Sequence, residues 1–232
     1  MKIAATIAGL ALMATTSAQA VDLGVGVKVG TVGAGADISI ALTNTVNARL
    51  SLTKFNINDL NETVTIGDSG NEGDVDATMQ LDFGANALLL DWYVFDGTFH
   101  LTAGMMKNNG KVDFSGVLLN SVTVDGQPID TSDIDGAITG SVSLGDSYQP
   151  YVGIGWGRKA SSEPGLSFSL EIGVALLDPK ATLSATVDGT GANGLSQSEL
   201  DTRIQNAEND VNSELSVFEA WPVLSVGLNY AF

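Results

Sequence analysis

Hydrophobic and polar residues alternate along most of the chain. At its C-terminal end small or polar residues separate the apolar positions Leu224, Val226, Leu228, Tyr230 and Phe232. Successive side chains of a β-strand point to opposite faces, so this period of two predicts a strand with one apolar face. Seven further segments repeat the pattern, at 21–29, 36–42, 46–53, 77–86, 99–106, 148–157 and 166–176. The sequence therefore predicts eight strands.

The face opposite the apolar residues is glycine-rich, small or polar in these segments. A soluble β-sandwich also alternates, but its strands are typically shorter and its second face is not glycine-rich. Tilted strands of about ten residues span the apolar layer of an outer membrane, and closure of the sheet leaves no unpaired edge. We therefore expect an all-β fold, a transmembrane up-and-down antiparallel β-barrel.

The predicted connections differ in length. Long ones separate the strands at 56–75, 108–147 and 178–217, whereas the others are short. In outer-membrane barrels the short turns face the periplasm and the long loops face outwards. Residues 111–119 and 137–144 also alternate, so they form either an extracellular hairpin or a further strand pair that raises the strand count to ten.

The last long connection contains a helical pattern over residues 196–215. Ser196 and Glu199 fit a capping box at its start. Apolar residues then recur on one helical face, at Leu200, Ile204, Ala207, Val211 and Leu215. The predicted helix either lies over the barrel mouth or only fixes a long loop.

Residues 1–20 have the layout of a cleaved secretory signal peptide. Lys2 is followed by an apolar stretch and by the small-residue site Ala18-Gln19-Ala20. The apolar stretch is too short for a membrane-spanning helix, which needs about 20 residues. Residues 21–232 are then expected to form one barrel domain of the Gram-negative outer membrane.

The composition excludes several classes of protein. The formal net charge is −17, so the chain repels nucleic acid. Cysteine is absent, which excludes disulfides and thiolate metal sites. His100 is the only histidine and is predicted near the periplasmic end, where it suits no lipid-modifying hydrolase. The acidic segment Asp130–Gly136 lacks the spacing of an EF-hand and is expected to be a solvated loop. We expect neither an enzyme nor a bound metal or cofactor.

Aromatic residues gather where the fourth, fifth and last strands are predicted to meet the periplasmic interface. They are Trp92, Tyr93, Phe95, Phe99, Tyr230 and Phe232. Aromatic girdles anchor barrels at membrane interfaces, so we predict this role for them.

The ending Pro222–Phe232 resembles the terminal signal of outer-membrane barrel proteins, in which an alternating strand ends in an aromatic residue. The resemblance implies that the barrel-assembly machinery recognises the alternating residues named above, from Leu224 to Phe232. The chain is also similar to small outer-membrane proteins of the OmpW and OmpA-barrel kind, notably at 90–97 and 151–157. The likeness to OmpW-type proteins implies passage of small hydrophobic molecules.

If the apolar faces contact lipid, the opposite faces turn polar side chains into the lumen. The predicted inward residues include Gln80 and Tyr151 and a charge network of Lys28, Asp37, Arg49, Asp82, His100 and Glu171. An eight-stranded barrel is just wide enough for side chains to fill it, and an unpaired buried charge is costly. We expect these groups to pair and close the interior; a gated small-solute channel is the alternative.

Two functions fit these features. The first is a monomeric barrel with a structural or porin-like role, embedded among membrane lipid and lipopolysaccharide. The second is surface recognition or adhesion through the long acidic loops. The sequence does not decide between them.

Overall fold

The structure is a computed structural model. It describes residues 22–66, 72–95, 97–119, 121–124, 127–129, 138–145, 147–185, 196–216 and 219–232. The predicted signal peptide and the acidic segment Asp130–Gly136 lie outside the described residues.

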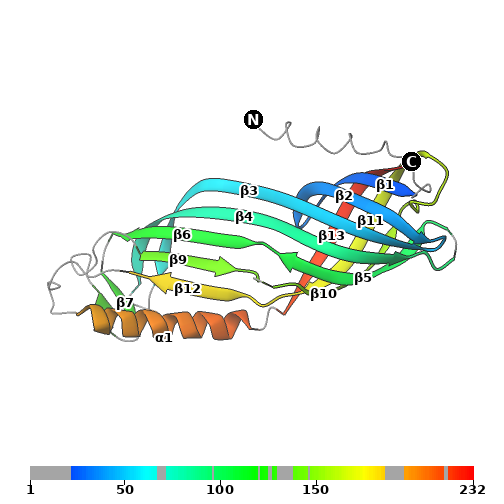
Figure 1. The fold of residues 1–232 in the computed structure, drawn as a ribbon. Coiled ribbons are helices and arrows are strands. Elements are labelled where there is room, and N and C mark those ends of the chain that lie inside the picture. Colours follow the sequence, from blue (N-terminus) through cyan, green and yellow to red (C-terminus); the bar gives the residue numbers. More distant parts are fainter. Residues whose placement is uncertain are drawn as a thin grey trace.

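Eight antiparallel strands close into a ring (Figure 1). In order around the ring they are β1 (Leu23–Gly30), β2 (Gly33–Thr43), β3 (Val46–Ile66), β4 (Gly73–Trp92), β5 (Phe99–Asn108), β10 (Gln149–Trp156), β11 (Gly165–Leu176) and β13 (Ala220–Ala231). Pairing of β1 with β13 and of β4 with β5 completes the closure. The predicted eight-stranded up-and-down barrel is confirmed.

One wall of the barrel continues beyond the ring as an open sheet, which we call the extension. The extension begins with the C-terminal half of β3 and the N-terminal half of β4. Next to β4 it continues, in this order, with β6 (Lys111–Leu118), β9 (Ile138–Ser143) and β12 (Lys180–Ser184). The short strands β7 (Val122–Val124) and β8 (Gln127–Ile129) form a separate pair. Because β6 and β9 pair in the extension and not in the ring, the barrel has eight strands and not ten.

The helix α1 (Gln197–Leu215) lies along β12, as Figure 1 shows. The predicted capping box is present, since the Ser196 side chain accepts from the Glu199 N–H and the Glu199 side chain accepts from the Ser196 N–H. Asn212 accepts from the Ala181 N–H at 2.8 Å and donates to the Ala181 carbonyl at 3.1 Å. The helix thus satisfies backbone groups of the outermost strand, which would otherwise be an open edge.

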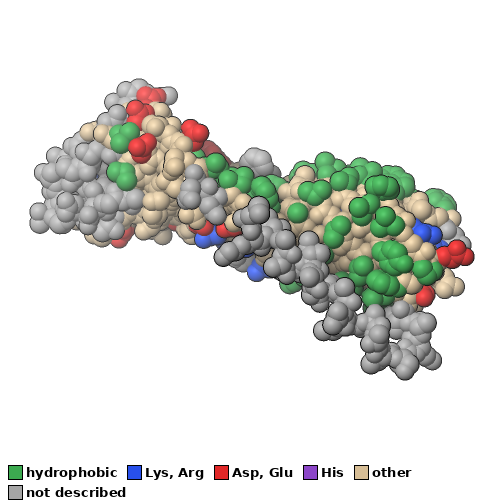
Figure 2. All heavy atoms as spheres, turned by 90° about the horizontal axis from the view of Figure 1, so that it is seen from above, with side chains coloured by type: hydrophobic (Ala, Val, Ile, Leu, Met, Phe, Trp, Pro, Cys, Tyr) green, Lys and Arg blue, Asp and Glu red, His purple; other side chains and the backbone are tan. Residues whose placement is uncertain are grey.

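The outer wall of the ring is apolar. Leu88, Leu166 and Phe168 are among its exposed side chains, and every ring strand contributes such residues. Figure 2 shows hydrophobic side chains over most of the barrel surface and far fewer over the extension. Among the described residues, no helix is long and apolar enough to cross a membrane.

The predicted orientation of the fourth strand is wrong. Ala85, Ala87 and Leu89 face the lumen, whereas Leu88 and Leu90 face outwards. Residues 77–83 lie in the extension, where the apolar face continues the lumen side and the polar face continues the outer side. The alternation reverses because the outer face of the ring is apolar, whereas that of the extension is polar.

Candidate functional site

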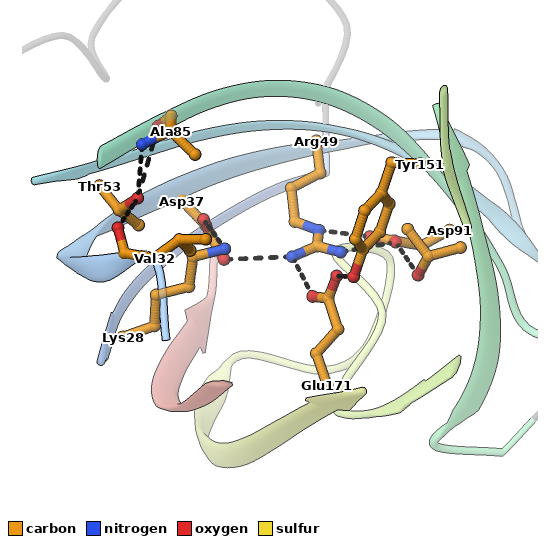
Figure 3. Close-up of polar contacts among 10 residues, drawn as sticks. Lys28, Val32, Asp37, Arg49, Thr53, Ala85, Asp91, Tyr151 and Glu171 are labelled. Carbon is orange, nitrogen blue, oxygen red and sulfur yellow. Dashed lines mark hydrogen bonds and ion pairs between the residues drawn. The ribbon is translucent and has the colours of Figure 1, made fainter. Parts of the chain in front are cut away.

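The lumen contains a network of charged side chains centred on Arg49 of β3 (Figure 3). Its Nε donates to Asp91 Oδ2 at 2.8 Å and its second terminal nitrogen donates to Asp91 Oδ1 at 2.9 Å. This two-point contact is the geometry that guanidinium and carboxylate groups favour. Asp91 also accepts from the Thr102 hydroxyl of β5 at 2.8 Å, which fixes the carboxylate from the other side.

The other terminal nitrogen of Arg49 reaches two more strands. It donates to Glu171 Oε2 of β11 at 2.6 Å and to Asp37 Oδ2 of β2 at 3.3 Å. Lys28 Nζ of β1 lies 3.1 Å from Asp37 Oδ1. The side chains in these ion pairs are at most 12% exposed. Three carboxylates and two cations therefore form one buried network, in which each charge has an opposite partner.

Tyr151 of β10 completes the network. Its hydroxyl donates to Glu171 Oε1 at 2.5 Å, and the side chain is 1% exposed. The ring lies over Gly173, where an added Cβ would come within 2.1 Å of the Tyr151 hydroxyl oxygen. Glycine on the inner face thus makes room for an aromatic side chain. With Tyr151 included, seven of the eight ring strands contribute a residue to the network.

A layer of apolar side chains fills the lumen between the network and the extension. Thr53 anchors part of it, because its hydroxyl donates to the Val32 carbonyl at 2.8 Å and accepts from the Ala85 N–H at 3.0 Å. Gly33 follows Val32 with φ +105°, a conformation that favours glycine, so the turn can fold inwards. The buried members are Val32, Ala85, Ala87, Leu89, Met106, Tyr151, Ala175 and Val223, with Trp221 packed against them.

On the other side of the network lies a polar cavity of about 40 Å³. Asn47, His100, Ser167 and Asn229 are among its lining residues. A cavity of this size holds a few water molecules. Tyr93 and the segment 158–160 narrow the end of the cavity that lies away from the network. The Tyr93 hydroxyl donates to the Arg158 carbonyl there, and Ala160 is 2% exposed. The network and the apolar layer together separate this cavity from the extension.

The structure brings together Lys28, Asp37, Arg49 and Glu171 from the predicted network. Tyr151, also predicted to point inwards, contacts them. His100 faces inwards but does not contact the network. It lines the cavity, and the centroids of the His100 and Tyr93 rings are 4.9 Å apart.

Asp82 and Gln80 are not in the lumen. Both follow the outward face of β4 in the extension, where Asp82 lies opposite Lys111 and Gln80 opposite Asp113. Their prediction as lumen residues is corrected, because the phase of β4 is opposite to the expected one. Asp91, which lies between the predicted strand segments 77–86 and 99–106, binds Arg49 in the lumen instead of Asp82.

The predicted aromatic girdle is present in part. Trp92, Phe95 and Phe232 are exposed on the outside of the ring, and Phe95 lies against Phe99 with ring centroids 6.3 Å apart. Tyr93 differs, because it is 3% exposed and turns into the barrel end. The predicted assembly residues from Leu224 to Phe232 all face outwards on β13 or just after it.

The fold and the network define a closed antiparallel β-barrel with an apolar outer wall and a charged interior. The chain is similar to the crystal structure of Acinetobacter baumannii CarO2, with 20% identity over 90% of this chain and 98% of that chain and a TM-score of 0.53. It is also similar to Acinetobacter baumannii CarO, with 17% identity over 90% of this chain and 97% of that chain and a TM-score of 0.50. At these identities the likeness concerns the fold. No family model and no curated protein matches the chain.

Proposed function

We propose that the chain is an integral outer-membrane β-barrel whose lumen is held shut by the Arg49 network and admits small solutes only when that network opens. The observation that carries the proposal is Arg49 bound by three carboxylates from three other strands. The bonds to Asp91 and Asp37 hold the guanidinium between the neighbouring strands β4 and β2, and the bond to Glu171 of β11 crosses to the opposite wall. No solute passes the level of Arg49 while these bonds persist.

Membrane insertion is supported by the outer wall of the ring. Its exposed leucine, valine, isoleucine and aromatic side chains would be costly to keep in water. A closed ring leaves no unpaired backbone edge to contact lipid, which a membrane barrel requires. The three connections β2–β3, β4–β5 and β10–β11 are all short and lie at the end of the barrel that holds Phe232, whereas at the other end only the β1–β2 turn is short. We therefore place the Phe232 end in the periplasm and the extension outside the cell.

The lining of the lumen favours a polar solute over a hydrophobic one. Charged, amide and hydroxyl side chains line much of the cavity and make up the network, whereas the layer next to the extension is mostly apolar. Passage of small hydrophobic molecules, which the resemblance to OmpW-type proteins implies, stays a prediction. The proposal includes a monomer inserted by the barrel-assembly machinery and no catalytic step.

Swelling of proteoliposomes in small polar solutes tests permeation. Glu171→Ala removes the bond of Arg49 that crosses the lumen, and we expect proteoliposomes with this variant to swell faster than those with wild type. Glu219→Ala is the matched control, because Glu219 is an exposed carboxylate just outside β13. Equal and negligible swelling of all three folded, inserted proteins would show a permanently closed barrel.

Surface recognition is a second candidate function, and the extension favours it. Strands β3 and β4 have 21 and 20 residues, about twice what a membrane crossing needs, so they carry a folded sheet well beyond the ring. Replacing residues 110–143 by a short linker removes β6 and β9 and keeps every strand pair of the ring. Loss of cell adhesion with unchanged solute flux would favour recognition over permeation.

A further inference from the structure

Lysine residues follow directly after the apolar outer wall on the side of the barrel that carries the extension. On β3 the outward position after Leu52 is Lys54, and on β5 the outward position after Met105 is Lys107. The outward face of both strands therefore changes from apolar to cationic within one period of the strand.

Two more lysines stand at the start of the extension. Lys111 of β6 and Lys180 of β12 both pair with Ser143 of β9, one on each side, so the three residues share a row across the sheet. Lys54 pairs with Gly84 of β4, whose lack of a side chain leaves space beside the lysine. Figure 2 shows basic side chains at the narrow region between the barrel and the extension. We call Lys54, Lys107, Lys111 and Lys180 the lysine belt.

The belt concentrates positive charge in a strongly acidic chain. The whole sequence has 10 basic against 27 acidic residues, and four of the basic ones lie in this belt. Lys111 is paired with Asp113 at 2.7 Å, and Asp82 also faces outwards here. Lys54, Lys107 and Lys180 form no ion pair with the described residues. Their charges are therefore free to meet an external anion.

We propose that the lysine belt binds the phosphate groups of lipid headgroups in the outer leaflet. The location supports lipid phosphate as the partner, because the belt begins where the apolar wall ends, at the depth of the headgroups. Lysine suits this position, since its alkyl stem lies along apolar surface while its ammonium reaches the polar layer. The inference rests on the membrane insertion proposed above.

Lipid titration of the full chain tests the proposal. The purified protein in neutral detergent micelles is titrated with diphosphoryl lipid A, and bound lipid is counted by native mass spectrometry. Lipid A without its phosphates and inorganic phosphate serve as separate probes. A lysine near an anionic surface contributes about a fivefold change in affinity at low ionic strength. We therefore expect Lys54→Gln with Lys107→Gln to weaken diphosphoryl lipid A binding by about 25-fold.

Two control variants make the result specific. Lys111→Gln removes a lysine already paired with Asp113, so we expect a smaller loss than for either unpaired lysine. Lys159→Gln makes the same charge change at the opposite end of the barrel, between β10 and β11, and should bind lipid as wild type does. Circular dichroism confirms that each variant keeps its β-structure.

Retained binding in the double variant, or an equal loss in Lys159→Gln, would overturn the proposal. Equal binding of dephosphorylated lipid A would assign the contact to the acyl chains. Displacement by millimolar inorganic phosphate would assign the site to a free anion. Failure of the chain to enter liposomes at all would instead contradict the proposed function.

Discussion

Arg49 and Asp91 are joined by two parallel hydrogen bonds, of 2.8 and 2.9 Å, on the inner faces of β3 and β4. The pair is diagonal in the sheet, since Arg49 lies opposite Leu89 and Asp91 opposite Asn47. Two nitrogens of the arginine thus bind Asp91 on the neighbouring strand β4, and the third binds Asp37 on the other neighbour, β2, and Glu171 of β11 across the lumen. This arrangement makes Arg49 the residue on which the stability and the closure of the lumen both depend.

Replacing Arg49 by methionine should destabilise the barrel by about 3–5 kcal/mol, because three buried carboxylates lose their shared cation. Urea unfolding in lipid vesicles measures the change. Lys54→Met is the control, since it removes one exposed cation that forms no ion pair with the described residues and should cost under about 1 kcal/mol. Similar losses for the two variants would mean that the network adds little to stability.

Gly173→Ala should destabilise the protein by about 1–3 kcal/mol, because the new Cβ would collide with the Tyr151 ring. Gly157→Ala adds the same methyl group where the nearest atom, Ser169 Cβ, lies 3.4 Å away, and should be close to neutral. The same unfolding assay compares them. A harmless Gly173→Ala would show that Tyr151 does not pack as described.

Asn212→Ala should leave the edge of β12 open to water, since the Asn212 side chain forms hydrogen bonds with both the N–H and the carbonyl of Ala181. We expect amide hydrogen exchange at Ala181 to accelerate about fivefold or more, the equivalent of one hydrogen bond of about 1 kcal/mol. Asn206→Ala, at an exposed position of the same helix, is the control. Unchanged exchange at Ala181 would mean that α1 does not protect this edge.

The start of α1 should become less stable in acid. Hydrogen bonds from the backbone and side chain of Ser196 lower the pKa of Glu199, so the folded state favours the charged carboxylate. This stabilisation is complete above the ordinary glutamate pKa of about 4.3 and is lost as the pH falls through the lowered value. The protection factor for hydrogen exchange in the first helical turn, which corrects for the pH dependence of the chemical exchange rate, should therefore fall on acidification in wild type.

Glu199→Gln tests the assignment of that acid response. Glutamine still accepts from Ser196 but does not titrate, so the protection factor in the first turn should change little over the same pH range. An identical acid response in wild type and Glu199→Gln would assign it to another group.

Much of the fold follows from the alternation in the sequence. Strands β11 and β13 have one apolar and one small or polar face, which is what a strand between lipid and a narrow lumen requires. The capping box of α1 is equally local, since Ser196 and Glu199 are three residues apart. Such features depend on neighbours in the chain, so the sequence alone predicts them.

The fourth strand shows where this reasoning fails. Leu88, Leu89 and Leu90 are consecutive because the outer wall and the apolar layer of the lumen both require apolar side chains there. The period of two disappears in this run, so the alternation predicts a strand that stops before Asp91 and a lumen position for Asp82. The sequence does not predict the contact between α1 and β12 either, because the contact joins segments about 30 residues apart through backbone groups that every sequence has.

Single-channel recording in planar bilayers tests whether the Arg49 network closes the lumen. We expect few, brief openings for wild type and for Arg49→Lys, which keeps the charge. Arg49→Ala should open frequently, with selectivity for cations, because Asp37, Asp91 and Glu171 then outnumber Lys28. An Arg49→Ala barrel that is folded, inserted and as silent as wild type would show that the network does not close the lumen.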